Sequence, residues 1–145
     1  MPQPHPSALT IVQKQDLRTH AMQAAQHSYS PYSKFRVGAA LLLSDGNIVT
    51  GCNVENASYR LTCCAEQSAI ARAVAEHGPS ICLRAVAIAN LNNSASMPCG
   101  ACRQTLAEFG GDDTLILYPA EDGLAETTLG EILPAAFRAH YFVSQ

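Results

Sequence analysis

Two segments of the chain carry cysteines at spacings that suit metal binding. Cys64 stands two residues before Glu66, and Cys99 and Cys102 form a Cys-x-x-Cys pair inside the sequence PCGACRQ. Two thiolates at positions i and i+3 of a helix start can face one ion, and the positive end of the helix dipole favours the ligating thiolate form. Two thiolates do not complete a tetrahedral zinc site, so Cys64 is the natural third ligand.

Glu66 favours a catalytic zinc site over the alternatives. A catalytic site uses three protein ligands and keeps a fourth position for water, whose protons a nearby carboxylate can take and return. A structural site would need a further closing ligand. Cys63 could supply it, although adjacent residues rarely reach one ion from a helix start. A Cys-x-x-Cys pair can also be a redox centre. Structural zinc and a redox pair therefore stay open as alternatives.

Composition restricts the class of protein and its setting. The chain has 145 residues, of which 48% are hydrophobic and 14% charged, as expected for one domain with a buried core. The net charge is -3, and no basic stripe is present that would suit a nucleic acid. No apolar run approaches the roughly 20 residues of a membrane span, and the first residues lack a signal-peptide pattern. We expect a cytoplasmic protein with residues 1–7 as a flexible tail and residues 8–145 as a single domain.

The cysteines are expected at the starts of two helices beside one sheet. An Asp-Gly pair between two β-prone runs is a strong hairpin signal, while a Gly-Pro and a Gly-Gly pair act as helix stops. The expected helices cover residues 9–27, 64–77, 99–109 and 131–138, and the expected strands cover residues 35–44, 47–54, 81–90, 114–119 and 125–129. This order predicts an α/β domain in which helices cover one sheet.

Five segments spread over residues 8–137 carry motifs that occur together in one family. They are 31-PYSKFRVGAALL-42, 51-GCNVENASY-59, 64-CAE-66, 98-PCGACRQ-104 and 130-GEILPAAF-137. Zinc deaminases share a Cys or His, one residue, a Glu and a later Pro-Cys-x-x-Cys. In these motifs the chain resembles the small cytidine deaminases of pyrimidine salvage, members of the cytidine/deoxycytidylate deaminase family that hold zinc with three cysteines.

The resemblance implies a fold and a reaction. The fold would be a three-layer α/β/α cytidine-deaminase-like fold with a mixed five-stranded sheet flanked by helices. The reaction would be zinc-dependent hydrolytic deamination of cytidine and 2′-deoxycytidine to uridine and 2′-deoxyuridine, with release of ammonia. Cys64, Cys99 and Cys102 would hold one Zn²⁺ per subunit. Glu66 would be the catalytic proton shuttle between the attacking water and the base.

The resemblance also implies residues that contact the nucleoside. Asn53 and Glu55 would hydrogen-bond the ribose 3′-hydroxyl, which would discriminate against free cytosine. Phe35 would pack against the pyrimidine, and the backbone N–H of Ala65 would contact the base.

The implied assembly is a homotetramer whose active sites are completed by neighbouring subunits. Tyr59 would contribute across subunits, and Phe137 would reach into a neighbouring site. The partners would therefore be a nucleoside substrate and further copies of the chain, with no nucleic acid and no membrane.

Gln67 departs from the family pattern. Three-cysteine members typically have an arginine directly after the glutamate, whereas this chain has Gln67. Three thiolates leave zinc with a net negative charge, which weakens it as a Lewis acid, and an uncharged glutamine cannot offset that charge. We expect Gln67 to act around the metal ligands. Either the zinc-bound water is more basic than in arginine-bearing relatives, or another group compensates for the missing charge. The pH–rate profile of Gln67→Arg beside wild type tests this expectation.

Two rival functions use the same residues. A deaminase of modified cytidines, such as N4-substituted cytidine or a blasticidin S-like nucleoside, would share the site, since the sequence does not reveal the pocket for the leaving group. A structural zinc module that binds a protein partner would have no use for a proton carrier. Replacing Glu66 by alanine should abolish uridine formation in an enzyme but change neither binding nor fold in such a module.

Overall fold

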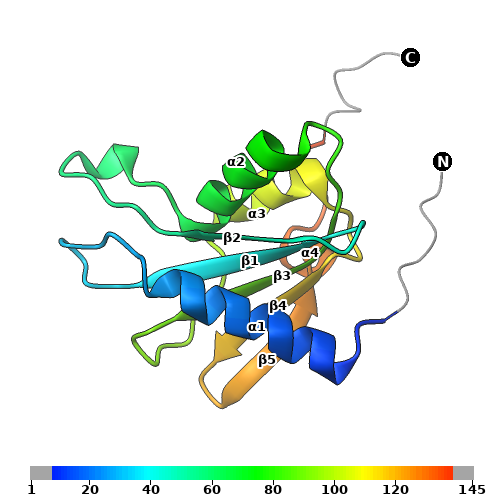
Figure 1. Ribbon diagram of the computed structural model, residues 1–145, viewed down its shortest axis with the longest axis horizontal. Helices are drawn as coiled ribbons and strands as arrows, with labels where there is room; N and C mark the ends of the chain where they lie inside the picture. The colour runs from blue at the N-terminus through cyan, green and yellow to red at the C-terminus, as the bar shows by residue number, and fades with distance from the viewer. Residues whose placement is uncertain (1–7, 139–145) are drawn as a thin grey trace.

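The computed structural model describes residues 8–138, which form a five-stranded sheet between helices (Figure 1). The elements in chain order are α1 (Ile11–Ala25), β1 (Val37–Leu43), β2 (Ile48–Cys52), the 3₁₀ helix η1 (Tyr59–Leu61), α2 (Ala65–His77), β3 (Leu83–Asn90), α3 (Gly100–Phe109), β4 (Leu115–Ala120), β5 (Gly123–Thr128) and α4 (Leu129–Ile132). The tail predicted at residues 1–7 lies outside the described residues, as do residues 139–145 of the proposed single domain.

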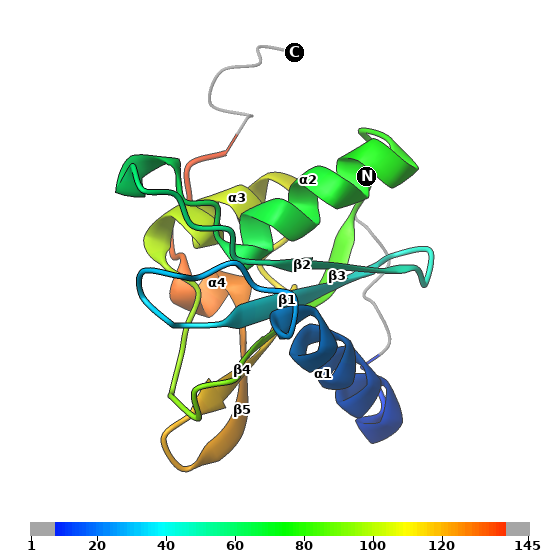
Figure 2. The same cartoon turned by 60° about the vertical axis from the view of Figure 1, so that its left-hand side comes forward.

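The sheet is mixed, with the strand order β2-β1-β3-β4-β5. β1 pairs antiparallel with β2 and β3, β3 pairs parallel with β4, and β4 pairs antiparallel with β5. A parallel pair requires a crossover connection, and α3 lies in the connection between β3 and β4. Helix α1 covers one face of the sheet, while α2 and α3 cover the other (Figure 2). The predicted three-layer α/β/α fold is confirmed.

Two buried apolar clusters join the layers. Beneath α2 and α3 the cluster contains large side chains, among them Leu41, Leu106 and Ile116. Five of the eight buried residues in the cluster between α1 and the sheet are alanines, which lets this helix lie close to the sheet. Gly38 permits the closest approach, because a Cβ there would lie 2.0 Å from the backbone oxygen of Ala21.

Gly51 permits another close approach, on the other face of the sheet. A Cβ at Gly51 in β2 would lie 2.4 Å from the backbone nitrogen of Ala69 and 2.8 Å from the backbone oxygen of Ala65. A hydrogen bond joins the helix to the strand at this point, since the hydroxyl of Ser68 in α2 accepts the N–H of Cys52 in β2 at 3.1 Å. The first turn of α2 is therefore held directly against the end of β2.

The last helix is shorter than predicted. The expected helix covered residues 131–138, whereas α4 begins at Leu129 and ends at Ile132. Thr128 caps its start, because the hydroxyl accepts the N–H of Glu131 at 3.4 Å. Pro134 cannot donate a hydrogen bond that would extend the helix, and Ala135 adopts a left-handed φ of 52°. Across residues 8–138, no helix has the length and hydrophobicity that crossing a membrane requires.

Candidate metal centre and active site

The three predicted cysteine ligands meet at the starts of two helices. Cys64 is the N-cap of α2, Cys99 is the N-cap of α3, and Cys102 lies in the first turn of α3. Their Sγ atoms all lie within 4.8 Å of one another, and those of Cys99 and Cys102 are 3.2 Å apart. Helices α2 and α3 run side by side over the same face of the sheet, which brings their starts together (Figure 2).

The sulfur positions fit a zinc ion. Zinc binds thiolate sulfur at about 2.3 Å, so two ligands of a tetrahedral ion lie about 3.8 Å apart. The separations between the three sulfurs run from 3.2 Å for Cys99 and Cys102 to at most 4.8 Å, a range that includes this spacing. Cys63 does not belong to the group that the described residues form, and its Sγ instead contacts the carbonyl oxygen of Cys64 at 3.7 Å. Three sulfurs with an open fourth position are the donor set of a catalytic zinc site.

The sulfurs differ in how readily they lose a proton. A hydrogen bond with the Cys102 side chain lowers the pKa of Cys64 to about 7. The same hydrogen bond, together with burial, raises the pKa of Cys102. A divalent cation that binds these thiols as thiolates displaces their protons.

Glu66 lies beside the sulfurs in the first turn of α2. The residue is only 4% exposed, and this burial raises the pKa of its carboxyl group. A carboxyl group with a raised pKa is better matched to accepting and releasing protons near neutral pH. Glu66 therefore has the environment of a general acid and base.

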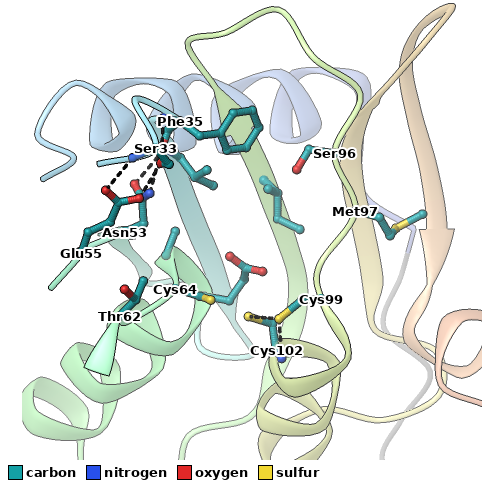
Figure 3. Close-up of a pocket in the computed structure, with 14 residues that line it drawn as sticks. Ser33, Phe35, Asn53, Glu55, Thr62, Cys64, Ser96, Met97, Cys99 and Cys102 are labelled. Atoms are coloured by element: carbon teal, nitrogen blue, oxygen red, sulfur yellow. Dashed lines mark hydrogen bonds between the residues drawn. The ribbon is translucent and has the colours of Figure 1, made fainter. Parts of the chain in front are cut away.

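Glu66 and the three cysteines line a cavity of about 310 Å³, a volume suited to a small molecule (Figure 3). Phe35 and Ser96 lie on the side of the cavity away from Cys99, as Figure 3 shows. Ala65 also lines the cavity, and its backbone N–H at the first position of α2 is one of the groups that a helix start leaves without an intrahelical partner.

Asn53 lines the cavity, but most of the hydrogen-bonding capacity of its side chain is used within the protein. Its Oδ1 accepts the N–H of Val37 at 3.0 Å and the hydroxyl of Ser28. Its Nδ2 donates to the carbonyl oxygen of Phe35 at 2.8 Å. Since a primary amide has two N–H groups, one N–H of Asn53 is left for a ligand.

Glu55 lines the same cavity with its carboxylate held in place. Its Oε1 accepts the backbone N–H groups of Tyr32 at 3.0 Å and Ser33 at 3.2 Å, and its Oε2 accepts the hydroxyl of Ser33 (Figure 3). These hydrogen bonds, led by the one from the Ser33 hydroxyl, lower the pKa of Glu55. Glu55 therefore presents an ionised, oriented acceptor to a ligand hydroxyl.

Tyr59 and Phe137 do not line this cavity. Their exposed fractions are 76% and 56%, and the Tyr59 ring packs edge-on against Tyr32 with 6.2 Å between the ring centroids. Neither Tyr59 nor Phe137 therefore contributes to the cavity of its own subunit. Their predicted role was in a neighbouring subunit's site, and it stays a prediction.

Six residues that line the cavity were not foreseen from the sequence. They are Ser33, Val37, Thr62, Ile88, Ser96 and Met97. Ser96 and Met97 directly precede the PCGAC motif, Thr62 lies two residues before Cys64, and Ser33 and Val37 each lie two residues from Phe35, so closeness to a motif was the available signal. Ile88 had no such signal, because it reaches the cavity from β3.

The side chain of Gln67 contacts the backbone of a metal ligand. Its Oε1 accepts the N–H of Cys64 at 3.2 Å, as the third residue of a helix does in a capping box. The side chain of Gln67 therefore stabilises the backbone conformation of Cys64 at the start of α2. The expectation about the basicity of the zinc-bound water stays a prediction.

We expect Gln67→Ala to weaken zinc binding about fivefold, because the loss of a capping contact costs about 1 kcal/mol. Competition with a chromophoric chelator measures this affinity. Gln13→Ala is the matched control, since Gln13 accepts the N–H of Thr10 at 2.9 Å in the capping box of α1 on the opposite face of the sheet. The control should lose similar stability but keep its zinc affinity, and equal zinc affinity in both variants would contradict the prediction.

The sequence matches known proteins over most of its length. Residues 11–118 match the family described as the cytidine and deoxycytidylate deaminase zinc-binding region. The cytidine deaminase of Mycobacterium tuberculosis is 48% identical over 121 residues, which are 83% of this chain and 86% of that protein. The cytidine deaminase of Halalkalibacterium halodurans is 43% identical over 127 residues, which are 87% of this chain and 95% of that protein.

Solved structures show the same similarity. The crystal structure of cytidine deaminase from Mycobacterium tuberculosis gives a TM-score of 0.76 at 47% identity, covering 85% of this chain and 95% of that one. The crystal structure of cytidine deaminase from Burkholderia pseudomallei gives a TM-score of 0.78 at 38% identity, covering 89% of this chain and 100% of that one.

Proposed function

Because this chain belongs to the cytidine and deoxycytidylate deaminase family, we propose that it hydrolytically deaminates cytidine and 2′-deoxycytidine. The products are uridine or 2′-deoxyuridine and ammonia. The observation that carries the proposal is the presence of three cysteine sulfurs and a buried glutamate in one cavity. This combination supplies the metal ligands and the proton carrier that the reaction needs.

Glu66 is the catalytic residue in this proposal. Cys64, Cys99 and Cys102 would hold a zinc ion, which would supply a Lewis acid that lowers the pKa of the attacking water. Glu66 accepts a proton from the attacking water and delivers it to N3 of the base, and it later helps to protonate the departing amino group. Its burial and raised pKa support this role, because the same carboxyl group must hold and release protons in turn.

Cavity residues other than the metal ligands and Glu66 hold the nucleoside in this proposal. The oriented carboxylate of Glu55 accepts a hydrogen bond from the ribose 3′-hydroxyl, and the remaining N–H of Asn53 donates to the same oxygen. Phe35 packs against the pyrimidine, and Ala65 contributes its backbone N–H to the base. The places of these four residues around one cavity support the proposal.

An absorbance assay of the zinc-loaded protein tests the proposed function. Cytidine and 2′-deoxycytidine should be deaminated, and free cytosine should react at least about 100-fold more slowly, because it leaves the groups that bind ribose unpaired. N4-methylcytidine tests the rival substrate class. If the protein deaminated N4-methylcytidine faster than cytidine, its substrates would be modified cytidines. Zinc-loaded protein that deaminates none of these nucleosides would overturn the proposal.

We further propose that four copies assemble and complete one another's sites. Support comes from exposed apolar side chains on the segments around the cavity, a surface that association would cover. They are Tyr29, Tyr32, Val54, Tyr59 and Leu61.

The six free cysteines support a cytoplasmic setting, where thiols stay reduced.

Light scattering should give the mass of four copies of the 15.4 kDa chain. The variant Tyr59→Glu should shift the protein to smaller species, because it places a charge in the proposed contact. A wild-type protein that stays monomeric at micromolar concentration would contradict the tetramer.

A further inference from the structure

Asn92 fastens the loop after β3 to the segment before β1. Its Oδ1 accepts the N–H of Arg36 at 3.0 Å, and its Nδ2 donates to the carbonyl oxygen of Lys34 at 3.0 Å. These two backbone groups flank Phe35, so a single side-chain amide binds on both sides of the residue that carries the ring. The N–H of Leu91 adds a bond to the carbonyl oxygen of Arg36 at 3.0 Å.

The segment that carries Phe35 depends on side chains for its conformation. It precedes β1, and Lys34 adopts a left-handed φ of 61°, which persists only where the surroundings impose it. The N–H of Phe35 donates to the hydroxyl of Ser33 at 3.0 Å, and its carbonyl oxygen accepts from Asn53. Asn92 adds two contacts from the loop after β3, alongside the bond from Leu91 to Arg36. The guanidinium of Arg36 also donates to the carbonyl oxygen of Gln26 at the end of α1.

The loop that Asn92 belongs to is itself well anchored. Asn90, the last residue of β3, is 5% exposed, and its Oδ1 accepts the N–H groups of Asn92 at 3.0 Å and Ser94 at 3.2 Å. Farther along the loop, the N–H of Ser96 donates to the carbonyl oxygen of Pro119 in β4 at 2.9 Å. The loop is therefore tied to the sheet on both sides of Asn92.

We propose that Asn92 is a positioning residue that sets the distance between two walls of the nucleoside cavity. One wall carries Phe35 and the other carries Ser96, and the two residues lie near each other in the cavity (Figure 3). Asn92 belongs to the loop of Ser96 and binds the backbone around Phe35, so it determines where the ring stands relative to that loop. The inference rests on the proposed function, because it concerns the fit of the pyrimidine.

Removal of the Asn92 side chain should weaken binding and leave the chemistry intact. Asn92 does not line the cavity and belongs to neither the sulfur group nor the α2 turn of Glu66. Asn92→Ala loses both side-chain hydrogen bonds to the backbone on either side of Phe35. We expect about a tenfold rise in KM for cytidine and in Kd for uridine measured by calorimetry. The kcat and the zinc content should change by less than about twofold.

A double-mutant cycle with Phe35→Ala tests whether Asn92 acts through Phe35. In the Phe35→Ala background, Asn92→Ala should change KM by less than about twofold, because no ring remains to be positioned. Asn92→Asp keeps the acceptor for Arg36 but not the donor to Lys34, so it should give an intermediate KM in a folded protein. Asn47→Ala is the matched control, since this asparagine bonds Asp45 at 2.9 Å in the β1–β2 turn, and it should retain wild-type constants.

An equal rise in KM in both backgrounds, or a loss confined to kcat, would overturn the inference while the proposed function stands. A zinc-loaded wild-type protein that neither deaminates cytidine nor binds uridine would overturn the proposed function and this inference with it.

Discussion

Glu66→Gln should lower kcat for cytidine by about 10³-fold while the protein keeps its zinc. Glutamine matches the size of glutamate and still forms hydrogen bonds, but it cannot accept and return a proton. Proton transfer by a positioned group contributes about 10²- to 10⁴-fold to a rate, and Glu66 serves several transfers in the proposed cycle. The side chain is buried next to the three sulfurs, so the neutral replacement fits the same space.

The matched control is Glu76→Gln on the same helix. Glu76 forms an exposed ion pair with Arg72 at 2.8 Å and is remote from the cavity, so this variant should retain wild-type kcat. Steady-state absorbance assays and elemental analysis for zinc measure both quantities. If Glu66→Gln kept zinc and more than about a tenth of kcat, Glu66 would not be the proton carrier.

Replacing Cys64 by serine should remove zinc and activity, whereas Cys63→Ser should remove neither. The Sγ of Cys64 belongs to the group of three sulfurs, while that of its neighbour Cys63 does not. Changes outside the ligand shell already cost about 10- to 100-fold in metal affinity, so the loss of a thiolate ligand should cost at least about 100-fold. Added zinc should therefore raise the unfolding temperature of wild type and Cys63→Ser but not of Cys64→Ser.

This pair of variants also separates the alternatives that the sequence leaves open. Loss of zinc from Cys63→Ser as well would indicate a closed four-cysteine structural site. A wild-type protein that bound no zinc and cycled between a Cys99–Cys102 disulfide and two thiols would indicate a redox centre. Chelator titration and thiol counting distinguish these outcomes.

The local structure and the chemical groups of the site could be predicted from short sequence patterns. Signals for turns and helix ends act over a few residues, so the hairpin at Asp45-Gly46 and the helix starts at Cys64 and Cys99 could be predicted. The spacing of Cys99 and Cys102 likewise lies within one helical turn. The predicted helix over residues 131–138 was wrong, because helical composition there did not outweigh Pro134 and the left-handed Ala135.

Tertiary structure decided which distant groups meet. Cys64 and Cys99 are 35 residues apart, and they become neighbours only because α2 and α3 pack side by side on one face of the sheet. Asn92 binds backbone groups 56 and 58 residues away, and no local pattern marks that contact. Gly51 has its role for the same reason, since only the packed helix shows that a side chain would not fit. Such contacts depend on strand order and layer packing, which short sequence patterns do not encode.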